Sequence, residues 1–249
     1  MFKISVCLDI ARLLVARIRR KIMRDVIPRT KANVCFVLVS GGVDSTVALY
    51  LAQKIYKKVY AVELEYENRL PVEKDRVSNI LSVANVESFY IEYPRVIDRT
   101  TLENKHHLHE SNTFYYLTAA NLAQSYIRTN KITAVDIWAG QIRSDWLISK
   151  SFLKGNFFQY VPEASPSIYK LLNKIIRTDA SKQDVRIVTP FIYLNKDEIV
   201  EIGVQVNAPL KDTWSCSYDN NVPCSECQQC LERNQAFKKF NINEKSDNI

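Results

Sequence analysis

The chain has 249 residues, of which 47% are hydrophobic and 24% are charged, with only five glycines and six cysteines. These ordinary globular values exclude a disordered, collagen-like or disulfide-scaffold protein and favour one large domain with an appendage. Lys and Arg number 34 against 27 Asp and Glu, and the net charge of +7 favours an anionic ligand such as a nucleotide or a nucleic acid.

The first predicted element is a basic amphipathic helix over residues 8–26, which ends before Pro28. We treat residues 1–30 as an extension that packs its apolar stripe on the core. Its basic face is alternatively a surface for a protein partner, an anionic membrane or nucleic acid. The many basic residues argue against a secretory signal, and no uncharged run is long enough for a membrane span, so we expect a cytoplasmic protein.

Strands and helices alternate along the rest of the chain. We predict strands at 34–39, 59–65, 89–93, 134–138 and 185–192, and helices at 45–56, 76–84, 113–127 and 196–202, the last closed by Gly203. Residues 143–166 and 212–230 are expected to be irregular. The alternation predicts an α/β fold with a doubly wound parallel sheet, whose ligand site lies beyond the carboxyl ends of the strands.

The first strand leads into its helix through the segment SGGVDST, residues 40–46. Backbone N–H groups and the helix dipole converge on an anion there, and the two glycines let the backbone come close to it. The segment lacks the Gly-Lys-Ser/Thr of a Walker A loop and the third glycine of a dinucleotide-binding loop. We predict a phosphate-binding loop, with a tight structural turn as the alternative.

Four of the six cysteines, Cys216, Cys224, Cys227 and Cys230, fall within fifteen residues. In a chain that is not secreted, this spacing points to a metal before disulfides. Four thiolates complete a tetrahedral shell around Zn²⁺ and leave no open position, which favours a structural site. An iron–sulfur cluster and reduced cysteines without metal are the alternatives.

Two segments carry a resemblance to known families. The SGGVDS segment resembles the PP-loop of the ATP pyrophosphatase superfamily, whose members cleave ATP between the α and β phosphates. Residues 189–200 and 213–237, the latter with the four cysteines, resemble the QueC or 7-cyano-7-deazaguanine synthase family. The resemblance implies a HUP-like Rossmannoid PP-loop domain at 31–205, a zinc-binding segment at 206–240 and a flexible tail at 241–249.

That resemblance also implies an activity. An ATP-dependent ligase would adenylate the carboxylate of 7-carboxy-7-deazaguanine or a relative, and ammonia would displace AMP to give an amide and then, with a second ATP, a nitrile. Mg²⁺ would bridge the phosphates near Asp44, and the protein is expected to be a homodimer. We expect Asp44, Ser45 and Lys196 to be catalytic, and the ATP-binding residues to be Ser40, Gly41, Gly42, Asp44, Ser45, Thr46 and Lys196.

Lys196 opens its predicted helix, where the dipole disfavours a cation unless an anion lies in front of it. A phosphate accounts for this position, and a solvated surface lysine is the alternative. The segment after the second strand keeps the Tyr66, Arg69 and Glu73 of the resembled family but loses its Gly, Gln and His. The nucleotide side is therefore only partly matched.

The expected substrate residues are Asn112, Gly140, Gln141, Arg143 and Asp145, by resemblance to the family's loops. Ser111 and Ser165 stand where that family has arginines, and Ile142 stands where it has Asn. Arg binds a carboxylate through two parallel hydrogen bonds and Ser cannot, so the acyl substrate is held differently or is another molecule. Arg143 is the nearest replacement by sequence.

Other functions stay open at this stage. A diverged relative would act on a different acyl acceptor, a protein or a tRNA, for example in a defence system. A nucleic-acid-binding module with a degenerate ATP site would use the basic helix and the zinc segment. His106, His107 and His109 share a loop with Glu110, and we interpret them as solvated or partner-facing rather than catalytic or metal-binding.

Overall fold

The computed structural model describes residues 31–66, 69–92, 111–149, 158–177, 184–218 and 222–243. The predicted basic helix, the loop with the three histidines and the end of the polar tail lie outside the described residues. Within the described part of the chain, no helix combines the length and the apolar character needed to cross a membrane.

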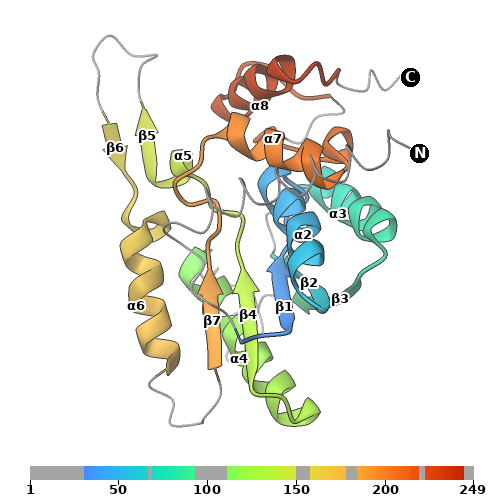
Figure 1. Ribbon diagram of the computed structural model, residues 1–249. Helices are drawn as coiled ribbons and strands as arrows, with labels where there is room; N and C mark the ends of the chain where they lie inside the picture. Colours follow the sequence, from blue (N-terminus) through green and yellow to red (C-terminus); the bar gives the residue numbers. More distant parts are fainter. Residues whose placement is uncertain are drawn as a thin grey trace, which may run out of the picture.

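Five parallel strands form the central sheet, in the order β3-β2-β1-β4-β7 (Figure 1). They are β1 (Val34–Leu38), β2 (Lys58–Glu65), β3 (Glu87–Glu92), β4 (Ala134–Trp138) and β7 (Asp184–Val188). The chain adds β2 and β3 on one side of β1 and then returns to add β4 and β7 on the other. This is the predicted doubly wound order, and its change of direction opens a crevice at the carboxyl ends of β1 and β4.

Helices cover both faces of the sheet. One face carries α2 (Val43–Ile55), α3 (Pro71–Ala84) and α7 (Lys196–Val206), and α8 (Gln228–Lys239) packs on α7. The other face carries α4 (Asn112–Asn130) and α6 (Pro166–Arg177). The carboxyl ends of the strands point toward the end of the molecule that carries α7, α8 and the short helix α5 (Arg143–Trp146) (Figure 1).

Whereas the edge strand β3 is largely exposed, the central strands β1 and β4 are buried on both faces, which explains why they read as nearly continuous apolar runs. The exception is Asp136 in β4, which is fully buried. Its carboxylate accepts hydrogen bonds from the Arg186 guanidinium at 2.8 to 3.0 Å and from the Tyr56 hydroxyl at 2.7 Å. A charge can be buried there because it is paired and hydrogen-bonded.

Several predicted boundaries were wrong. The strand predicted at 185–192 ends at Val188, because a turn follows Pro190. Gly203 does not close α7 but lies inside it: a Cβ there would come within 2.7 Å of Leu210 Cδ2, so glycine permits the close packing. The helix continues to Val206 and ends at Asn207, which adopts the left-handed conformation.

The two stretches expected to be irregular contain regular elements. The first holds α5, the antiparallel pair β5 (Leu147–Ser149) and β6 (Phe158–Tyr160), and the 3₁₀ helix η1 (Pro162–Ala164). The second holds the 3₁₀ turn η2 (Leu210–Asp212) and the start of α8. Helix α6 was not predicted at all. Ala236 and Phe237 of α8 belong to the same core as α2 and α7, so the cysteine segment packs directly on the domain.

Candidate active site and metal centre

A cavity of about 620 Å³ lies beyond the carboxyl ends of β1, β2 and β4. It is lined by the loops that follow these strands, by the start of α4, by η1, and by residues on either side of the cysteines. This volume lies in the range of small-molecule sites, and the position is the one that a doubly wound sheet offers to ligands.

Residues 40–46 between β1 and α2, here called the glycine loop, border the cavity. Gly41 has a φ of 88°, and a Cβ there would lie 2.9 Å from the Glu73 carbonyl oxygen on α3. The hydroxyls of Ser40 and Ser45 lie 3.1 Å apart, and Ser45 Oγ accepts the Ser40 N–H at 3.2 Å. These contacts hold the loop in the shape of an anion-binding turn at the amino end of α2.

The predicted ATP-binding residues divide into two groups. Ser40, Gly42, Asp44, Ser45 and Lys196 line the cavity, whereas Gly41 and Thr46 are not among the lining residues. Thr46 is fully buried and its hydroxyl donates to the Gly42 carbonyl at 2.7 Å. We therefore correct the expected role of its hydroxyl: it supports the loop from behind.

Gly140 holds the loop after β4 against the glycine loop. A Cβ at this position would lie 2.7 Å from the Ser45 backbone nitrogen and 2.8 Å from the Asp44 carbonyl carbon. Backbone atoms cannot turn aside as a side chain can, so only glycine permits this contact. The two loops consequently share one wall of the cavity.

Lys196 and Asp44 form an ion pair inside the cavity, with Lys196 Nζ donating to Asp44 Oδ2 at 2.6 Å. Lys196 is the first residue of α7, where the side chain of Glu198 caps the Asn195 N–H at 3.0 Å. The second oxygen of Asp44, Oδ1, is enclosed by protein and has no hydrogen-bond partner among the described residues.

Asp145 is a second carboxyl group that lines the cavity together with Asp44. Burial raises the pKa of Asp145 to about 7 and the Asp44 charge adds to the shift, while the Ile142 N–H and Lys196 oppose it. The Ile142 N–H donates to Asp145 Oδ2 at 2.8 Å. Asp145 lines the cavity and keeps accessible surface, so it can exchange a proton with a ligand near neutral pH.

The opposite wall comes from the segment after β2. Tyr66 packs against Tyr115 of α4, with ring centroids 6.0 Å apart and planes inclined by 30°. Arg69 is buried and donates through Nη1 to Glu63 Oε1 at 2.7 Å. Burial raises the pKa of Glu73, and the neighbouring Arg69 charge opposes that shift. The two aromatic rings give this wall of the cavity a flat apolar surface.

The expected substrate residues do not all reach the cavity. Asn112, Gly140, Gln141 and Asp145 line it, and Gln141 Nε2 donates to the Tyr116 hydroxyl at 3.0 Å. Arg143 is exposed and is not among the lining residues; its backbone N–H donates to the Leu194 carbonyl at 3.0 Å. The structure therefore gives no support to Arg143 as the replacement guanidinium.

The serines at the two arginine positions have local structural roles. Ser111 is the N-cap of α4, and its side chain accepts the Phe114 N–H at 3.3 Å. Ser165 is fully buried and its hydroxyl donates to the Pro162 carbonyl at 2.6 Å. Neither serine lines the cavity.

The four clustered cysteines converge as predicted, with their Sγ atoms all within 4.8 Å of one another. Tetrahedral Zn–S bonds of about 2.3 Å place sulfurs about 3.8 Å apart, and Cys224 Sγ lies 3.9 Å from Cys230 Sγ. The Cys224 and Cys227 N–H groups donate to the sulfurs of Cys216 and Cys224 at 3.4 and 3.3 Å. The cluster could hold a metal ion.

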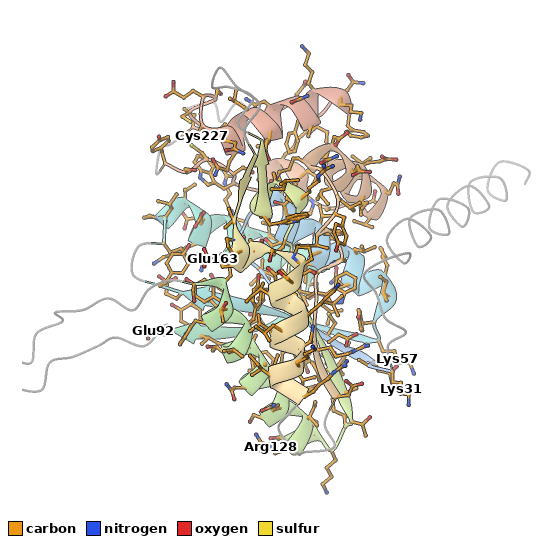
Figure 2. All side chains as sticks on the ribbon, turned by 90° about the vertical axis from the view of Figure 1, so that its left-hand side faces the viewer. Lys31, Lys57, Glu92, Arg128, Glu163 and Cys227 are labelled. Carbon is orange, nitrogen blue, oxygen red and sulfur yellow. The ribbon has the colours of Figure 1, made fainter. Side chains whose placement is uncertain are left out.

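The segment that carries the four cysteines also contacts the glycine loop. The Trp214 N–H donates to the Gly41 carbonyl at 2.9 Å, and the Trp214 indole donates to the Cys216 carbonyl at 2.9 Å. Glu232 on α8 accepts a hydrogen bond from the Ser144 hydroxyl at 3.0 Å. Cys227 lies toward the end of the molecule opposite Arg128, and Glu163, a cavity residue of η1, lies between them (Figure 2).

Several residues that line the cavity were not predicted as site residues, namely Tyr115, Tyr116, Ser144, Glu163, Trp214 and Glu232. Trp214 could have been found from its position two residues before the first clustered cysteine. Glu232 gave no signal, because a carboxylate on a polar helix is ordinary until the fold turns it inward.

This doubly wound parallel sheet, with an SGGVDS loop between its first strand and first helix and a cavity above it, is an α/β enzyme fold whose ligand site lies where the strand order changes direction. The family comparison narrows that class. The chain belongs to the QueC family, described as "Queuosine biosynthesis protein QueC", whose model matches residues 34–241. The family predicted from the sequence is thereby confirmed.

Curated relatives are named 7-cyano-7-deazaguanine synthase. The one from Persephonella marina is 26% identical over 230 residues, covering 83% of this chain and 92% of its own. The one from Campylobacter jejuni subsp. jejuni serotype O:2 is 29% identical over 224 residues, covering 84% and 95%. This agreement in length supports an enzyme of the same kind.

Solved structures give more distant likenesses. The U34-tRNA thiolase NcsA from Methanococcus maripaludis, with its [4Fe-4S] cluster, is 13% identical with a TM-score of 0.45, covering 93% of this chain and 72% of its own. The NMN synthetase from Francisella tularensis is 15% identical with a TM-score of 0.45, covering 92% of both chains.

Proposed function

We propose that this protein is an ATP-dependent carbon–nitrogen ligase that converts 7-carboxy-7-deazaguanine, or a relative of it, to the amide and then the nitrile. AMP and pyrophosphate would be the products from ATP, and ammonia the nitrogen source. One observation carries the proposal: the glycine loop with its Lys196–Asp44 pair opens on the same cavity as Gln141 and Asp145. Membership of the QueC family and the names of the relatives support it.

The glycine loop would bind the phosphates of ATP through its backbone N–H groups and the amino end of α2. Lys196 would balance the negative charge that builds on the departing pyrophosphate when the substrate carboxylate attacks the α-phosphorus. These residues act by position and charge, which is most of what phosphoryl chemistry asks of a protein.

Asp44 is the residue that fits a magnesium ion. Its Oδ1 is enclosed without a hydrogen-bond partner among the described residues, and carboxylate oxygens are the ligands that Mg²⁺ prefers. Bound Mg²⁺ would supply positive charge between the phosphate oxygens. Oδ2 of the same carboxylate keeps its contact with Lys196 at 2.6 Å, so Asp44 would position both cations.

Asp145 would accept the proton in the amide-forming step. The ammonia nitrogen forms a bond to the acyl carbon, AMP leaves with the electrons of the acyl–oxygen bond, and one proton is released from nitrogen. A carboxyl group whose pKa is about 7 is suited to receive that proton near neutral pH.

The four cysteines would hold Zn²⁺ in a structural site, since all four positions of a tetrahedron are filled by protein. Zn²⁺ would supply the bonds that fix the segment bearing Trp214 and Glu232. The residues that contact the cavity are then held by a short segment whose own apolar cluster is small.

A diverged substrate is the second candidate, and the charges of the cavity favour it. Asp145, Glu163 and Glu232 line the side of the cavity near β4, while Ser111 and Ser165 are engaged in local structure. Carboxylates accept hydrogen bonds and repel another negative charge, so this side of the cavity suits a substrate group that donates hydrogen bonds better than it suits the carboxylate of 7-carboxy-7-deazaguanine.

The proposal is tested by incubating the protein with ATP, Mg²⁺, ammonium and 7-carboxy-7-deazaguanine. We expect AMP and pyrophosphate in amounts that depend on the acid, and the nitrile in mass spectra. ADP and phosphate as products would contradict the PP-loop chemistry. AMP release that does not respond to the acid would favour the diverged substrate.

A further inference from the structure

Only two of the described residues that line the cavity are cationic, Lys196 and Arg69. Lys196 already pairs with Asp44 at 2.6 Å. Arg69 comes from the segment after β2, and Lys196 comes from α7, beyond the opposite edge strand β7. The glycine loop follows β1, which lies between β2 and β4, so the two cations flank the phosphate site from opposite sides.

The guanidinium of Arg69 is only partly used by the protein. Arg69 is 4% exposed, and Nη1 makes its contacts: Glu63 Oε1 at 2.7 Å, the Leu64 carbonyl at 3.2 Å and Glu65 Oε2 at 3.5 Å. Nη2 is enclosed and has no hydrogen-bond partner among the described residues. A buried donor without an acceptor is unfavourable, and a cavity wall is where a ligand can supply the acceptor.

Arg69 is held close to the glycine loop by the start of α3. Leu70 caps this helix, and the Glu73 carbonyl in its first turn lies 2.9 Å from the position of a Cβ on Gly41. The side chain of Val77 lies 3.2 Å from the same position. The first turns of α3 and the glycine loop are therefore in direct contact, and Arg69 occupies the wall beside them.

We propose that Arg69 is a second phosphate-binding residue, whose Nη2 donates to a phosphate oxygen of the nucleotide. Nη1 keeps its contact with Glu63, which orients the planar guanidinium. This inference rests on the proposed function, because it requires the glycine loop to bind a nucleotide. Gln141 and Asp145 follow β4, which lies on the opposite side of β1 from β2. A nucleotide at the glycine loop would therefore lie closer to Arg69 than an acyl substrate beside Gln141 and Asp145.

The test measures binding of the non-hydrolysable α,β-methylene analogue of ATP with Mg²⁺, and of adenosine, to the full chain by calorimetry. Arg69→Gln is expected to weaken binding of the analogue about tenfold or more, since a charge-assisted hydrogen bond is lost. Adenosine has no phosphate, so its dissociation constant should stay within about twofold of the wild type. Arg128→Gln, at the far end of α4, is the matched control for net charge and should change neither.

Glu63→Gln supplies a variant that keeps Arg69. It removes the carboxylate charge but leaves an amide oxygen that can accept the Nη1 hydrogen bond, so the guanidinium stays oriented and binding of the analogue should tighten by about threefold. Weaker or unchanged binding in Glu63→Gln would overturn the proposal. An equal loss of adenosine and analogue in Arg69→Gln would also overturn it, because the effect would then be structural. So would a loss of 7-carboxy-7-deazaguanine binding with the analogue unaffected.

The two proposals fail in different ways. If the wild-type chain binds no analogue, the nucleotide site is wrong and the role of Arg69 is refuted with it. If the wild type binds the analogue and Arg69→Gln binds it as tightly, only the role of Arg69 is refuted.

Discussion

Replacing Gly140 by Ala is expected to displace the phosphate-binding loop while leaving the fold in place. The added methyl would lie 2.7 Å from the Ser45 nitrogen and 2.8 Å from the Asp44 carbonyl carbon. Non-bonded carbon atoms are most stable about 3.5 to 4.0 Å apart, so the two loops must separate by roughly 0.7 to 1 Å. Both contacts are to backbone, and rotation of a side chain cannot relieve them.

A shift of this size is large for a site that positions reacting groups. Misplacement by about 1 Å can lower a rate about 100-fold, and we expect AMP formation to fall by about that factor. Overpacking also lowers the free energy of unfolding by about 1 to 3 kcal/mol. For a chain of this length, each kcal/mol lowers the melting temperature by about 2 to 4 °C.

Gly203→Ala is the matched control, because it adds the same methyl at a similarly crowded position inside α7. The atoms it would meet are side-chain methyls, Leu210 Cδ2 at 2.7 Å and Val47 Cγ2 at 2.8 Å, and not the backbone of the two cavity loops. We expect it to lower stability and to leave the dissociation constant of the ATP analogue nearly unchanged. Calorimetry and AMP release measure both effects, and wild-type nucleotide binding by Gly140→Ala would refute the argument.

Three further predictions follow from the ion pair, the cysteines and the cavity acid. Asp44→Asn should abolish AMP release with the fold intact. Lys196→Ala should weaken nucleotide binding by about 1.5 to 3 kcal/mol. Near wild-type turnover by both variants would exclude the assigned phosphate site. Cys224→Ser should lose bound metal and lower the melting temperature, measured by elemental analysis and calorimetry, whereas metal-free wild-type protein of equal stability would contradict a metal centre. The pKa of Asp145 is raised to about 7 in the folded chain. Between about pH 4 and 7 the carboxyl group is therefore more often protonated in the folded chain than in the unfolded chain. Its contribution to stability falls as pH rises through that window. Asp145→Asn should flatten that part of the profile of melting temperature against pH, and an unaltered slope would show that the carboxyl is not perturbed.

The glycine loop and the cysteines could be predicted because their signals are local in sequence. Two adjacent glycines between an apolar strand and a helix restrict the backbone to a few conformations, one of them the turn with Gly41 at a φ of 88°. Four cysteines at short spacing reach a common point without help from distant segments. The fold class followed equally from the alternation of strands and helices.

Residues that depend on tertiary packing could not be assigned in this way. Arg143 and Asp145 are two positions apart in the four-residue helix α5 and both are exposed, yet Asp145 lines the cavity and Arg143 does not. Nearness in sequence to a predicted substrate loop made Arg143 the candidate. Arg69, distant in sequence from that loop, is the guanidinium that the fold brings to the cavity wall.

The two long helices that were missed differ in the signal they carry. In α6 the buried residues Tyr169, Leu172 and Ile176 follow a helical spacing that periodicity could have identified. In α8 the buried face includes Arg233, which reads as a surface residue. Its guanidinium lies over the Phe237 ring at 4.1 Å and donates to Thr213 Oγ1 at 2.6 Å, and only the folded chain provides these partners.

The position of the cysteine cluster explains why a closed metal site would serve an active site in which it does no chemistry. Trp214 links the cysteine cluster to the cavity, because its backbone N–H donates to the Gly41 carbonyl of the glycine loop and its indole N–H donates to the Cys216 carbonyl. Gly41 is the residue of the loop with the least common backbone conformation, and it therefore gains most from a fixed hydrogen-bond partner. The apolar cluster around the cysteines has only three buried members among the described residues, two of them cysteines, and the segment is otherwise anchored to the main core through Ala236 and Phe237 of α8. A metal bound by the four thiolates would add to this anchoring and would act on the glycine loop through the hydrogen bond between the Trp214 N–H and the Gly41 carbonyl.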